Sequence, residues 1–349
     1  MQKIKLGVVF GGMSTENEVS VISANSVMKN LNKDTYDIYP IYIDKDGTWW
    51  EAEVDLNKTI NFGDEICNKA KIENVIQYLK KLEIIFPVLH GLYGEDGTIQ
   101  GLFEIANIPY VGCRVLASSV GMDKVYTKII FEKAGLKQAK YEYIRKYKDK
   151  YISIDEKMNE TIMELEEILN LVTEKLTFPM FVKPSNSGSS VGIHKADNKE
   201  QLKEAIQYAS EFDNKILIEE GIDGREVECA VLGNEDVIAS CVGEIKAADE
   251  FYSYDAKYKN QESKTDIPAN IPAELQNEIR KQAIKAFKAI DGKGLSRVDF
   301  FIENNTQQIY INEINTLPGF TDISMYPKLF EESGISYKEL LNKIINLSF

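Results

Sequence analysis

The chain has 349 residues, which is enough for two or three domains with several hydrophobic cores. It carries 41 Lys and Arg against 55 Asp and Glu, and the resulting net charge of −14 disfavours contact with phosphodiester backbones and anionic lipids. A hydrophobic fraction of 44% with 28% charged residues is typical of a soluble globular protein, and the apolar runs are only strand-length. Nucleic-acid binding and membrane association are therefore poor first hypotheses.

The N-terminus and the cysteines indicate a cytoplasmic protein. The chain passes from two lysines directly into a short apolar run and a glycine pair, with no signal-peptide core or cleavage site. Its cysteines, Cys67, Cys113, Cys229 and Cys241, lie far apart and form no CxxC or Cys/His cluster. We expect reduced, buried thiols, and neither a disulfide framework nor a structural zinc site.

The first part of the chain alternates between strand and helix patterns. Lys5–Phe10 and Ile84–Leu89 are short apolar strands, Val19–Leu31 has helical spacing, and Tyr36–Ile43 predicts a strand that a Lys-Asp-Gly turn closes. Strands that alternate with helices indicate a parallel sheet with helices on both faces. We therefore expect a doubly wound α/β domain over residues 1–112.

The rest of the chain predicts α+β structure. Helices are expected at Leu116–Ala134 and Pro272–Ile290, as a charged stretch between Asp155 and Lys175, and at the C-terminus. Strands are expected at Tyr141–Ile144, Phe178–Val182, Val191–Lys195, Ile216–Glu219, Val227–Leu232, Val237–Glu244, Arg297–Ile302 and Ile309–Asn315, with a polar loop to about Ile267. The Gly- and Ser-rich loop 184–190 thus lies between two strands.

Two glycine-bearing segments raise the question of nucleotide binding. Residues 10–19, FGGMSTENEV, follow a strand but lack the GxGxxG spacing of a dinucleotide site, and no GxxxxGK[ST] P-loop occurs. Residues 183–192, KPSNSGSSVG, offer a cation, small hydroxyl residues and glycines that allow a polyphosphate to approach the backbone. A flexible Ser/Gly turn is the commoner explanation of such a loop alone, so the phosphate interpretation needs further support.

That support comes from two neighbouring strands near the C-terminus. Arg297 and Asp299 share one strand face, and Glu313 and Asn315 share a face of the next strand. If the strands pair, carboxylate and amide oxygens converge beside a guanidinium, and these hard ligands suit Mg²⁺ held against phosphate. A solvated hairpin face is the alternative, but the intervening residues are strongly apolar.

The loop HGLYGEDG at residues 90–97 directly follows an apolar strand. It therefore lies at the carboxyl end of a strand, where open α/β sheets place their ligands. A lone histidine is more often structural than catalytic, and we interpret His194, the other histidine, as structural.

Together these segments resemble the ATP-grasp enzymes and, among them, the D-alanine:D-alanine ligases. The resemblance covers nearly the whole chain through seven segments in the family's order: GGMSTENEVS at 11–20, HGLYGEDGTIQG at 90–101, MDK at 122–124, KPSNSGSSVG at 183–192, YSYDAKY at 252–258, SRVD at 296–299 and NEINTLPG at 312–319. It implies α/β and α+β structure, with the N-terminal doubly wound domain followed by a two-domain ATP-grasp fold. We expect a central domain at 113–220 and a metal-binding C-terminal domain at 221–349.

The activity that the resemblance implies is ATP-dependent joining of two D-alanine molecules for peptidoglycan synthesis. Because a carboxylate is a poor electrophile, such enzymes first transfer the γ-phosphate of ATP to one D-alanine, and the amine of the second then attacks the acyl phosphate. The implied cofactors are ATP and Mg²⁺, with two ions expected and Mn²⁺ able to substitute. The implied partners are these small molecules and a second copy of the chain in a homodimer.

The resemblance also carries the family's residue roles to matching positions. Matching the ATP-binding residues are Lys124, Lys183, Ser190, Glu219, Glu226 and Lys257, and matching the metal ligands are Asp299, Glu313 and Asn315. Arg297 and the backbone N–H of Gly319 match the donors to a tetrahedral oxyanion. Glu16 matches the anchor for the ammonium of the first D-alanine, with His90 near the acyl phosphate. Ser189 and Tyr258 match the hydroxyls that form a hydrogen-bonded triad with Glu16.

The second substrate is the point that the resemblance leaves open. The intact Ala-Lys-Tyr258 segment favours an amine over D-lactate. Ser324 and Met325 match the second-substrate subsite, and an apolar Met325 suits D-alanine, whereas relatives that use D-serine usually carry arginine there. The pattern departs from many family members at Asp322-Ile323, where they have Ser-His.

Two alternatives to a D-alanine:D-alanine ligase stay open. One is a D-alanine:D-serine ligase of the same family. The other is a catalytically silent ATP-binding regulatory protein, which the retained lysines, metal ligands and Arg297 disfavour.

Overall fold

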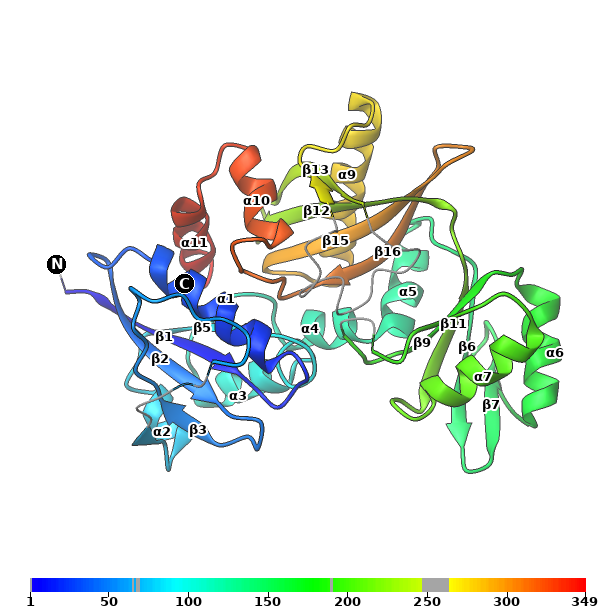
Figure 1. Cartoon of the computed structure of the whole chain (residues 1–349), viewed down its shortest axis with the longest axis horizontal. Helices are drawn as coiled ribbons and strands as arrows, with labels where there is room; N and C mark the ends of the chain where they lie inside the picture. Colours follow the sequence, from blue (N-terminus) through cyan, green and yellow to red (C-terminus); the bar gives the residue numbers. More distant parts are fainter. Residues whose placement is uncertain (1, 65, 67–69, 189–190, 247–263) are drawn as a thin grey trace.

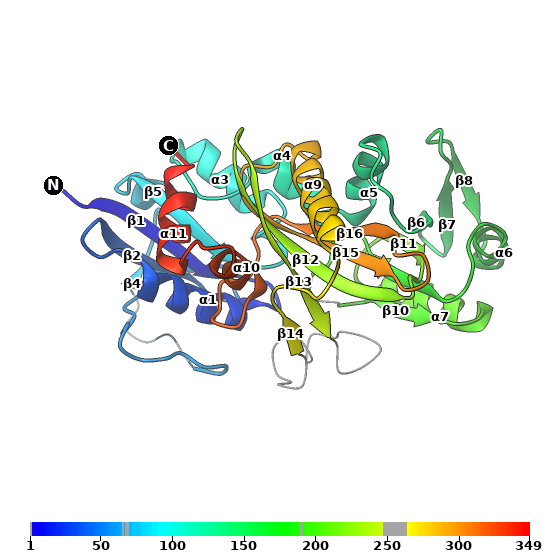
Figure 2. The same ribbon diagram turned by 90° about the horizontal axis from the view of Figure 1, so that it is seen from above.

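The computed structural model describes residues 2–64, 66, 70–188, 191–246 and 264–349. Three β-sheets follow one another along the longest axis of the molecule (Figure 1), and the view from above shows the same succession (Figure 2). The expected combination of α/β and α+β structure is confirmed.

The first sheet contains β1 and β5 in a parallel arrangement with β2, and it has the order β4-β3-β2-β1-β5. Its antiparallel edge is formed by the short β3 and β4. The elements are β1 (Ile4–Gly11), β2 (Tyr36–Ile43), β3 (Trp49–Glu51), β4 (Ala70–Lys71) and β5 (Ile84–Leu89), with helices α1 (Asn17–Asn30), α2 (Val75–Leu79) and α3 (Thr98–Ala106).

Both faces of this sheet are covered, as expected for a doubly wound fold. Leu6, Val8 and Phe10 of β1 pack with α1 and the C-terminal helices, whereas Val9 points to the opposite core, which contains Phe103 of α3. Successive side chains of a strand alternate between faces, so a strand buried on both sides is apolar at nearly every position. The strand predicted from the apolar run at Lys5–Phe10 is therefore confirmed, and the sheet order places it between β2 and β5.

The second sheet is antiparallel, in the order β10-β9-β11-β6-β7-β8. Its strands are β6 (Tyr141–Tyr147), β7 (Lys150–Ile154), β8 (Glu160–Met163), β9 (Met180–Pro184), β10 (His194–Ala196) and β11 (Lys215–Glu220). One face carries α6 (Leu165–Lys175) and α7 (Lys199–Ala209), which enclose one hydrophobic core with the sheet (Figure 1). The expected strand at 191–195 is shorter and later, because only residues 194–196 pair with β9.

The charged stretch at 155–175 was expected to be helical, and this is wrong for its first part. Residues 155–159 form a turn between β7 and β8, in which the Asp155 carboxylate accepts N–H groups of Lys157 and Asn159 at 2.9 and 2.8 Å. The helix α6 begins only after Glu164, which forms a capping box with Glu167. Local side-chain hydrogen bonds to the backbone thus replaced a helical turn here.

The third sheet is also antiparallel, in the order β14-β13-β12-β15-β16. Its strands are β12 (Gly224–Gly233), β13 (Ile238–Lys246), β14 (Lys264–Asp266), β15 (Gly294–Glu303) and β16 (Ile309–Asn315). The long α9 (Ala273–Ala289) covers one face, where Val227, Cys229 and Val231 are buried. The opposite face, with Ala230 and Leu232, packs with α10 (Met325–Glu332) and α11 (Tyr337–Asn346).

One long helix was expected at 116–134, but the structure has two, α4 (Val115–Met122) and α5 (Lys124–Lys133). The break is at Asp123, whose backbone is extended and whose carboxylate caps α5 by accepting the N–H of Tyr126 at 3.1 Å. Aspartate is a strong N-cap residue, and its cap begins a new helix directly after α4.

The predicted division at 113–220 and 221–349 stays a prediction, and the packing adds one observation to it. Cys113, Ala117 and Phe131 lie in the hydrophobic core beneath α9 and the third sheet, although they precede the second sheet in the chain.

Of the cysteines within the described residues, Cys113, Cys229 and Cys241 are free thiols, while Cys67 lies outside them. No helix of the described part combines the length and apolar character needed to cross a bilayer.

Candidate active site

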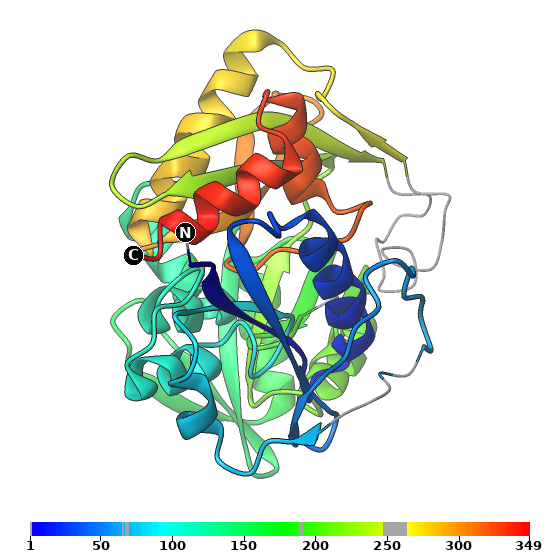
Figure 3. The same cartoon turned by 90° about the vertical axis from the view of Figure 1, so that its left-hand side faces the viewer.

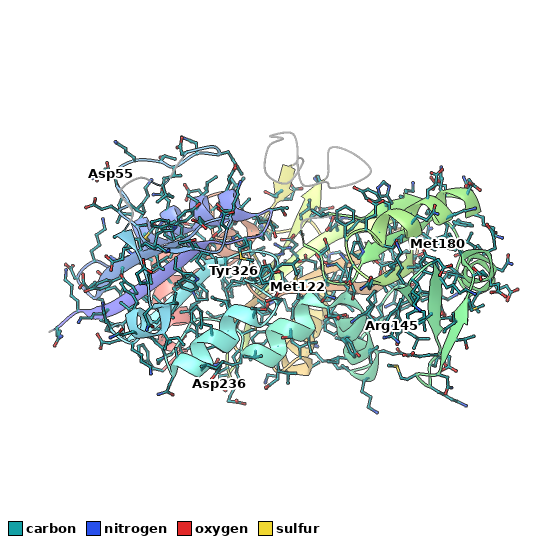
Figure 4. The ribbon with its side chains drawn as sticks, turned by 90° about the horizontal axis from the view of Figure 1, so that it is seen from below. Asp55, Met122, Arg145, Met180, Asp236 and Tyr326 are labelled. Carbon is teal, nitrogen blue, oxygen red and sulfur yellow. The ribbon has the colours of Figure 1, made fainter. Side chains whose placement is uncertain are left out.

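A cavity lies where the second and third sheets meet α4 and α5. Figure 4 shows Met122, at the end of α4, between the first sheet and the second sheet that carries Met180. The lining residues are Gly121, Lys124, Thr127, Lys128, Lys183, Leu217, Glu219, Asn312 and Glu313. Elements far apart in the sequence therefore contribute three ammonium groups and two carboxylates to one cavity.

Glu219 forms ion pairs with two buried lysines in this cavity. Its carboxylate is 2.8 Å from Nζ of Lys128 and also contacts Nζ of Lys183. Burial by itself would raise the pKa of Glu219, but the two ammonium groups outweigh it and lower this pKa to about 2. Burial would likewise lower the pKa of Lys183, yet Glu219, Glu313 and Glu226 raise it. Glu219 and Lys183 therefore both stay charged at neutral pH.

Lys124 is positioned by the residue that ends α4. The Asp123 carboxylate accepts the hydroxyl of Ser185 at 2.6 Å and an ammonium proton of Lys215, and the Lys124 N–H donates to the Ser185 carbonyl at 3.0 Å. Burial opposes ionisation of Asp123, but these donors lower its pKa. The Lys124 ammonium in turn donates to the carbonyl of Ser187 at 2.6 Å. This network joins the start of α5 to the base of the Gly-rich loop.

Glu313 connects the lysine cavity to the strand pair that carries the remaining charged residues. Its carboxylate is 3.8 Å from Nζ of Lys124, and β15 places Asp299 directly opposite it. The same register sets Arg297 opposite Asn315. The register of these two strands therefore brings the four side chains together, as the sequence predicted.

Arg297 makes a two-pronged ion pair with Asp299. Its Nε and a terminal NH₂ nitrogen donate to the two carboxylate oxygens, each at 2.7 Å. Nε is also 3.1 Å from Oε2 of Glu228, which β12 places opposite Asp299 on the other side. Burial would lower the pKa of Arg297, but Asp299 and Glu228 raise it well above its ordinary value. The guanidinium is thus a fixed positive charge.

The predicted metal ligands fit a hard divalent cation by their chemistry. Asp299 and Glu313 supply carboxylates from adjacent strands, and Asn315 adds an amide oxygen at the end of β16. In the described part of the chain, no three His, Cys, Asp or Glu side chains assemble as a metal site. A metal ion bound here would therefore need the Asn315 amide as its third protein donor, as the prediction had it.

Glu16 lies where the Gly-rich loop approaches the first sheet. A Cβ added to Gly91 would be 2.6 Å from the Glu16 carboxylate, and one added to Gly188 would be 3.0 Å from it. Gly91 also has a φ of +71°, so both the lack of space for a Cβ and the positive φ favour glycine there. Glu16 and His90 are both buried. Burial alone would lower the pKa of His90, but the hydrogen bond and charge of Glu95, together with the charge of Glu16, raise it. Glu16, His90 and the loop thus form one polar corner.

The segment after β16 contains the last predicted residues. A Cβ on Gly319 would be 2.8 Å from Oγ of Ser324, so these two residues touch. Met325, in contrast, is only 8% exposed, and its Cε would be 2.5 Å from a Cβ on Gly243 of β13. The structure therefore places Ser324 beside Gly319 and places Met325 in the hydrophobic core.

Four predicted site residues, Ser189, Ser190, Lys257 and Tyr258, lie outside the described residues. Two site residues were missed, Lys128 and Glu228. A helical spacing of four from Lys124 could have indicated Lys128. Glu228 had a weak signal, one carboxylate in the apolar run of β12, and only the strand register pairs it with Arg297.

Sequence comparison places this arrangement in a family. The profile described as D-ala D-ala ligase N-terminus matches residues 5–113, and the profile described as D-ala D-ala ligase C-terminus matches residues 130–346. The D-alanine–D-alanine ligase of Acetivibrio thermocellus is 51% identical over 99% of this chain and 96% of its own length. That of Ruminiclostridium cellulolyticum is 48% identical over 100% of this chain and 96% of its own.

Solved structures agree with the fold. The VanG D-Ala:D-Ser ligase from Enterococcus faecalis has a TM-score of 0.86 at 37% identity, covering 100% of both chains. The D-alanine–D-alanine ligase from Coxiella burnetii has a TM-score of 0.81 at 30% identity, covering 100% of this chain and 94% of that one. With its two matching profiles and full-length relatives, the chain belongs to the D-alanine–D-alanine ligase family of ATP-using enzymes.

Proposed function

We propose that this protein joins two D-alanine molecules to D-alanyl-D-alanine, with ATP as the source of energy and a D-alanyl phosphate as the intermediate. The observation that carries the proposal is the shared cavity of Lys124, Lys183 and Glu313, next to Arg297 and Asp299. Transfer of a phosphoryl group needs positive charge around its oxygens, and buried lysines supply it where little water screens them.

The chain's own residues account for the two chemical steps. Lys124 and Lys183, with Lys257, hold the phosphates, and Glu226 and Glu219 bind the nucleotide. Glu16 holds the ammonium of the first D-alanine. Asp299, Glu313 and Asn315 would hold Mg²⁺, as two ions or with Mn²⁺ in its place, and the metal would supply further charge neutralisation for the phosphates.

Attack by the second amine creates a tetrahedral oxyanion. Arg297 and the N–H of Gly319 are the donors to this oxyanion, and a fixed guanidinium stabilises it more than it stabilises the planar carbonyl. Ser189 and Tyr258 position the incoming amine with Glu16, and His90 lies by the acyl phosphate. Ser324 and Met325 remain the proposed subsite for the second D-alanine, although the core position of Met325 leaves it only a small exposed surface.

A D-alanine:D-serine ligase is the second candidate, and one observation favours it. The structural relative of TM-score 0.86 is described as a D-Ala:D-Ser ligase. Met325 argues for D-alanine, since an apolar, buried thioether offers no hydrogen-bond partner to a serine hydroxyl, and leaving such a group without a partner costs about 1–3 kcal/mol.

We also propose that the protein works as a cytoplasmic homodimer with domains at 1–112, 113–220 and 221–349. Dipeptide synthesis from cytoplasmic ATP fits that location.

The deciding experiment is a product assay with the purified protein, ATP and Mg²⁺. Phosphate release should require D-alanine, and mass spectrometry of mixtures of D-alanine and D-serine should show mainly D-alanyl-D-alanine. Equal release with L-alanine, or none with D-alanine, would refute the proposal. Lys183→Ala should abolish phosphoryl transfer while the circular dichroism spectrum stays that of the folded protein.

A further inference from the structure

The backbone of Phe320, the residue after Gly319, is held at its N–H and at its carbonyl by side chains of distant helices. The hydroxyl of Tyr337, at the start of α11, donates to the Phe320 carbonyl at 2.7 Å. The Phe320 N–H donates to Oγ of Ser23 in α1 at 3.4 Å, a contact between residues 297 positions apart. Figure 3 shows α1 and α11 near each other on the side of the molecule that carries the first sheet. The loop after β16 is thus fastened to both helices.

The ring of Phe320 is equally constrained. It is 1% exposed, packs edge-on against Phe86 of β5 at 5.7 Å and stacks on the ring of Tyr337 at 6.3 Å. The ring of Tyr326 is a third neighbour at 5.4 Å, and a buried ring in contact with three others cannot swing without opening a void. Side chain and backbone of Phe320 are therefore both fixed, and the peptide that joins Gly319 to Phe320 has little freedom to rotate.

The same loop holds Ser324 in place. Oγ of Ser324 accepts the Thr321 N–H at 3.0 Å, and the Ser324 N–H donates to the Thr321 carbonyl at 3.0 Å. Because a Cβ on Gly319 would press on Oγ of Ser324, the two residues lie against each other. Anchoring Phe320 therefore orients the proposed oxyanion donor and the proposed subsite hydroxyl together.

The α1 side of this arrangement reaches the substrate corner as well. Oγ of Ser23 is 3.2 Å from Nε2 of His90, and Ser26, one helical turn later, donates to Oδ1 of Asp322 at 2.7 Å. Oγ of Ser26 is also 3.3 Å from the hydroxyl of Tyr337. Burial raises the pKa of Tyr337, so its hydroxyl stays protonated and able to donate. One helix face thus connects His90, the loop and α11.

We infer that Ser23 and Tyr337 are positioning residues, which fix the backbone of Phe320 on both sides so that the N–H of the preceding residue, Gly319, points at the developing oxyanion. The inference rests on the proposed function, in which Gly319 is an oxyanion donor. A donor that is fixed before the reaction needs no reorganisation in the transition state, so a loosened loop should slow amine attack more than it weakens ATP binding.

The test compares two Tyr→Phe variants. Tyr337→Phe removes the hydroxyl that holds the Phe320 carbonyl but keeps the ring stack. Tyr326→Phe is the matched control, because Tyr326 donates to the Val231 carbonyl at 3.1 Å from the same aromatic cluster and has no hydrogen bond to the loop. Removing one oxyanion donor outright costs about 10²–10³ in kcat, so a misaligned donor should cost about tenfold.

The expected result is a kcat about tenfold lower for Tyr337→Phe, with KM for ATP and the Kd for ADP unchanged, and a kcat within about twofold of wild type for Tyr326→Phe. A phosphinate dipeptide, tetrahedral at the reacting centre, should bind Tyr337→Phe weaker by the same factor as kcat falls. Equal kcat losses in the two variants, or an unchanged phosphinate affinity, would overturn the inference.

Ser23→Ala provides a second test if Tyr337→Phe folds poorly by thermal melting. It should also lower kcat with KM for ATP unchanged, and the double variant should lose less than the product of the single losses, because both side chains hold the backbone of the same residue, Phe320. Independent, multiplicative losses would contradict a shared role.

The wild-type product assay separates the two proposals. An active wild type with unaffected variants refutes only the positioning role, whereas an inactive wild type refutes the proposed function.

Discussion

Glu228 lies 3.1 Å from Nε of Arg297, directly across the sheet from Asp299. The guanidinium therefore contacts two carboxylates, that of Asp299 on its own strand β15 and that of Glu228 on the neighbouring strand β12. Only Asp299 belongs to the proposed metal site, so Glu228 would still hold Arg297 if Asp299 bound a cation.

We expect Glu228→Gln to lower kcat several-fold, because the Arg297 guanidinium loses one of its two anchors. The matched control is Glu244→Gln, since Glu244 is similarly buried and makes a two-pronged ion pair with Arg225 on β12. Both variants should melt at lower temperature, because losing one partner of a buried pair costs up to about 3–5 kcal/mol. Steady-state kinetics with thermal melts would check this, and a kcat loss of the same size in Glu244→Gln would count against a specific role for Glu228.

The doubly paired Glu219 predicts acid-dependent stability. Its pKa falls from 4.5 to about 2 on folding, so the unfolded chain binds its proton first. The stabilising contribution is therefore complete above about pH 4.5 and is lost as the pH falls toward 2. Urea unfolding of wild type and Glu219→Gln should differ strongly at pH 7 and much less at pH 3.

Glu235→Gln is the control for this measurement, because Glu235 pairs with Lys293 at an exposed position. Its stability difference from wild type should be small at both pH values. A Glu219→Gln difference that persisted undiminished at pH 3 would show that the ionised pair is not its source.

Asp123→Ala should destabilise the protein and weaken nucleotide binding together. The variant loses the N-cap of α5, worth about 0.5–2 kcal/mol, and with it the contact that ties Lys124 to the Gly-rich loop. Asn198→Ala removes a comparable cap from α7, where Asn198 accepts the Gln201 N–H at 3.0 Å. Calorimetry with ADP should show weaker binding for Asp123→Ala alone, and equal affinities would separate Asp123 from the nucleotide site.

Met325→Ala should behave as a core truncation. Because Met325 is buried against β13 next to Leu329, we expect a loss of about 2–5 kcal/mol in the free energy of unfolding, measured by urea titration. The ratio of D-alanyl-D-alanine to D-alanyl-D-serine products should change little if packing is its main role. A large change in that ratio with little loss of stability would instead support a wall of the second-substrate subsite.

Local patterns in the sequence were sufficient to predict the elements whose apolar and polar residues follow one uninterrupted periodicity. The apolar run before Gly11 predicted a strand, and the matched faces of Arg297 with Asp299 and of Glu313 with Asn315 predicted their convergence. Boundaries set by hydrogen bonds from the backbone to one side chain were missed, as at Asp123 and at the turn begun by Asp155, because helical spacing continues across both.

The sequence by itself determined the alternating α/β start of the chain, the two charged strands and the order of segments from which the family follows. Only the tertiary structure decided that Glu219 lies between Lys128 and Lys183 and that Glu228 contacts Arg297. It also decided that Met325 is in the core and that Tyr337 donates to the Phe320 carbonyl. The physical reason is that periodicity depends on residues two to four positions apart. Strand register and helix docking, in contrast, join side chains that are tens to hundreds of positions apart, and no local pattern encodes those distances.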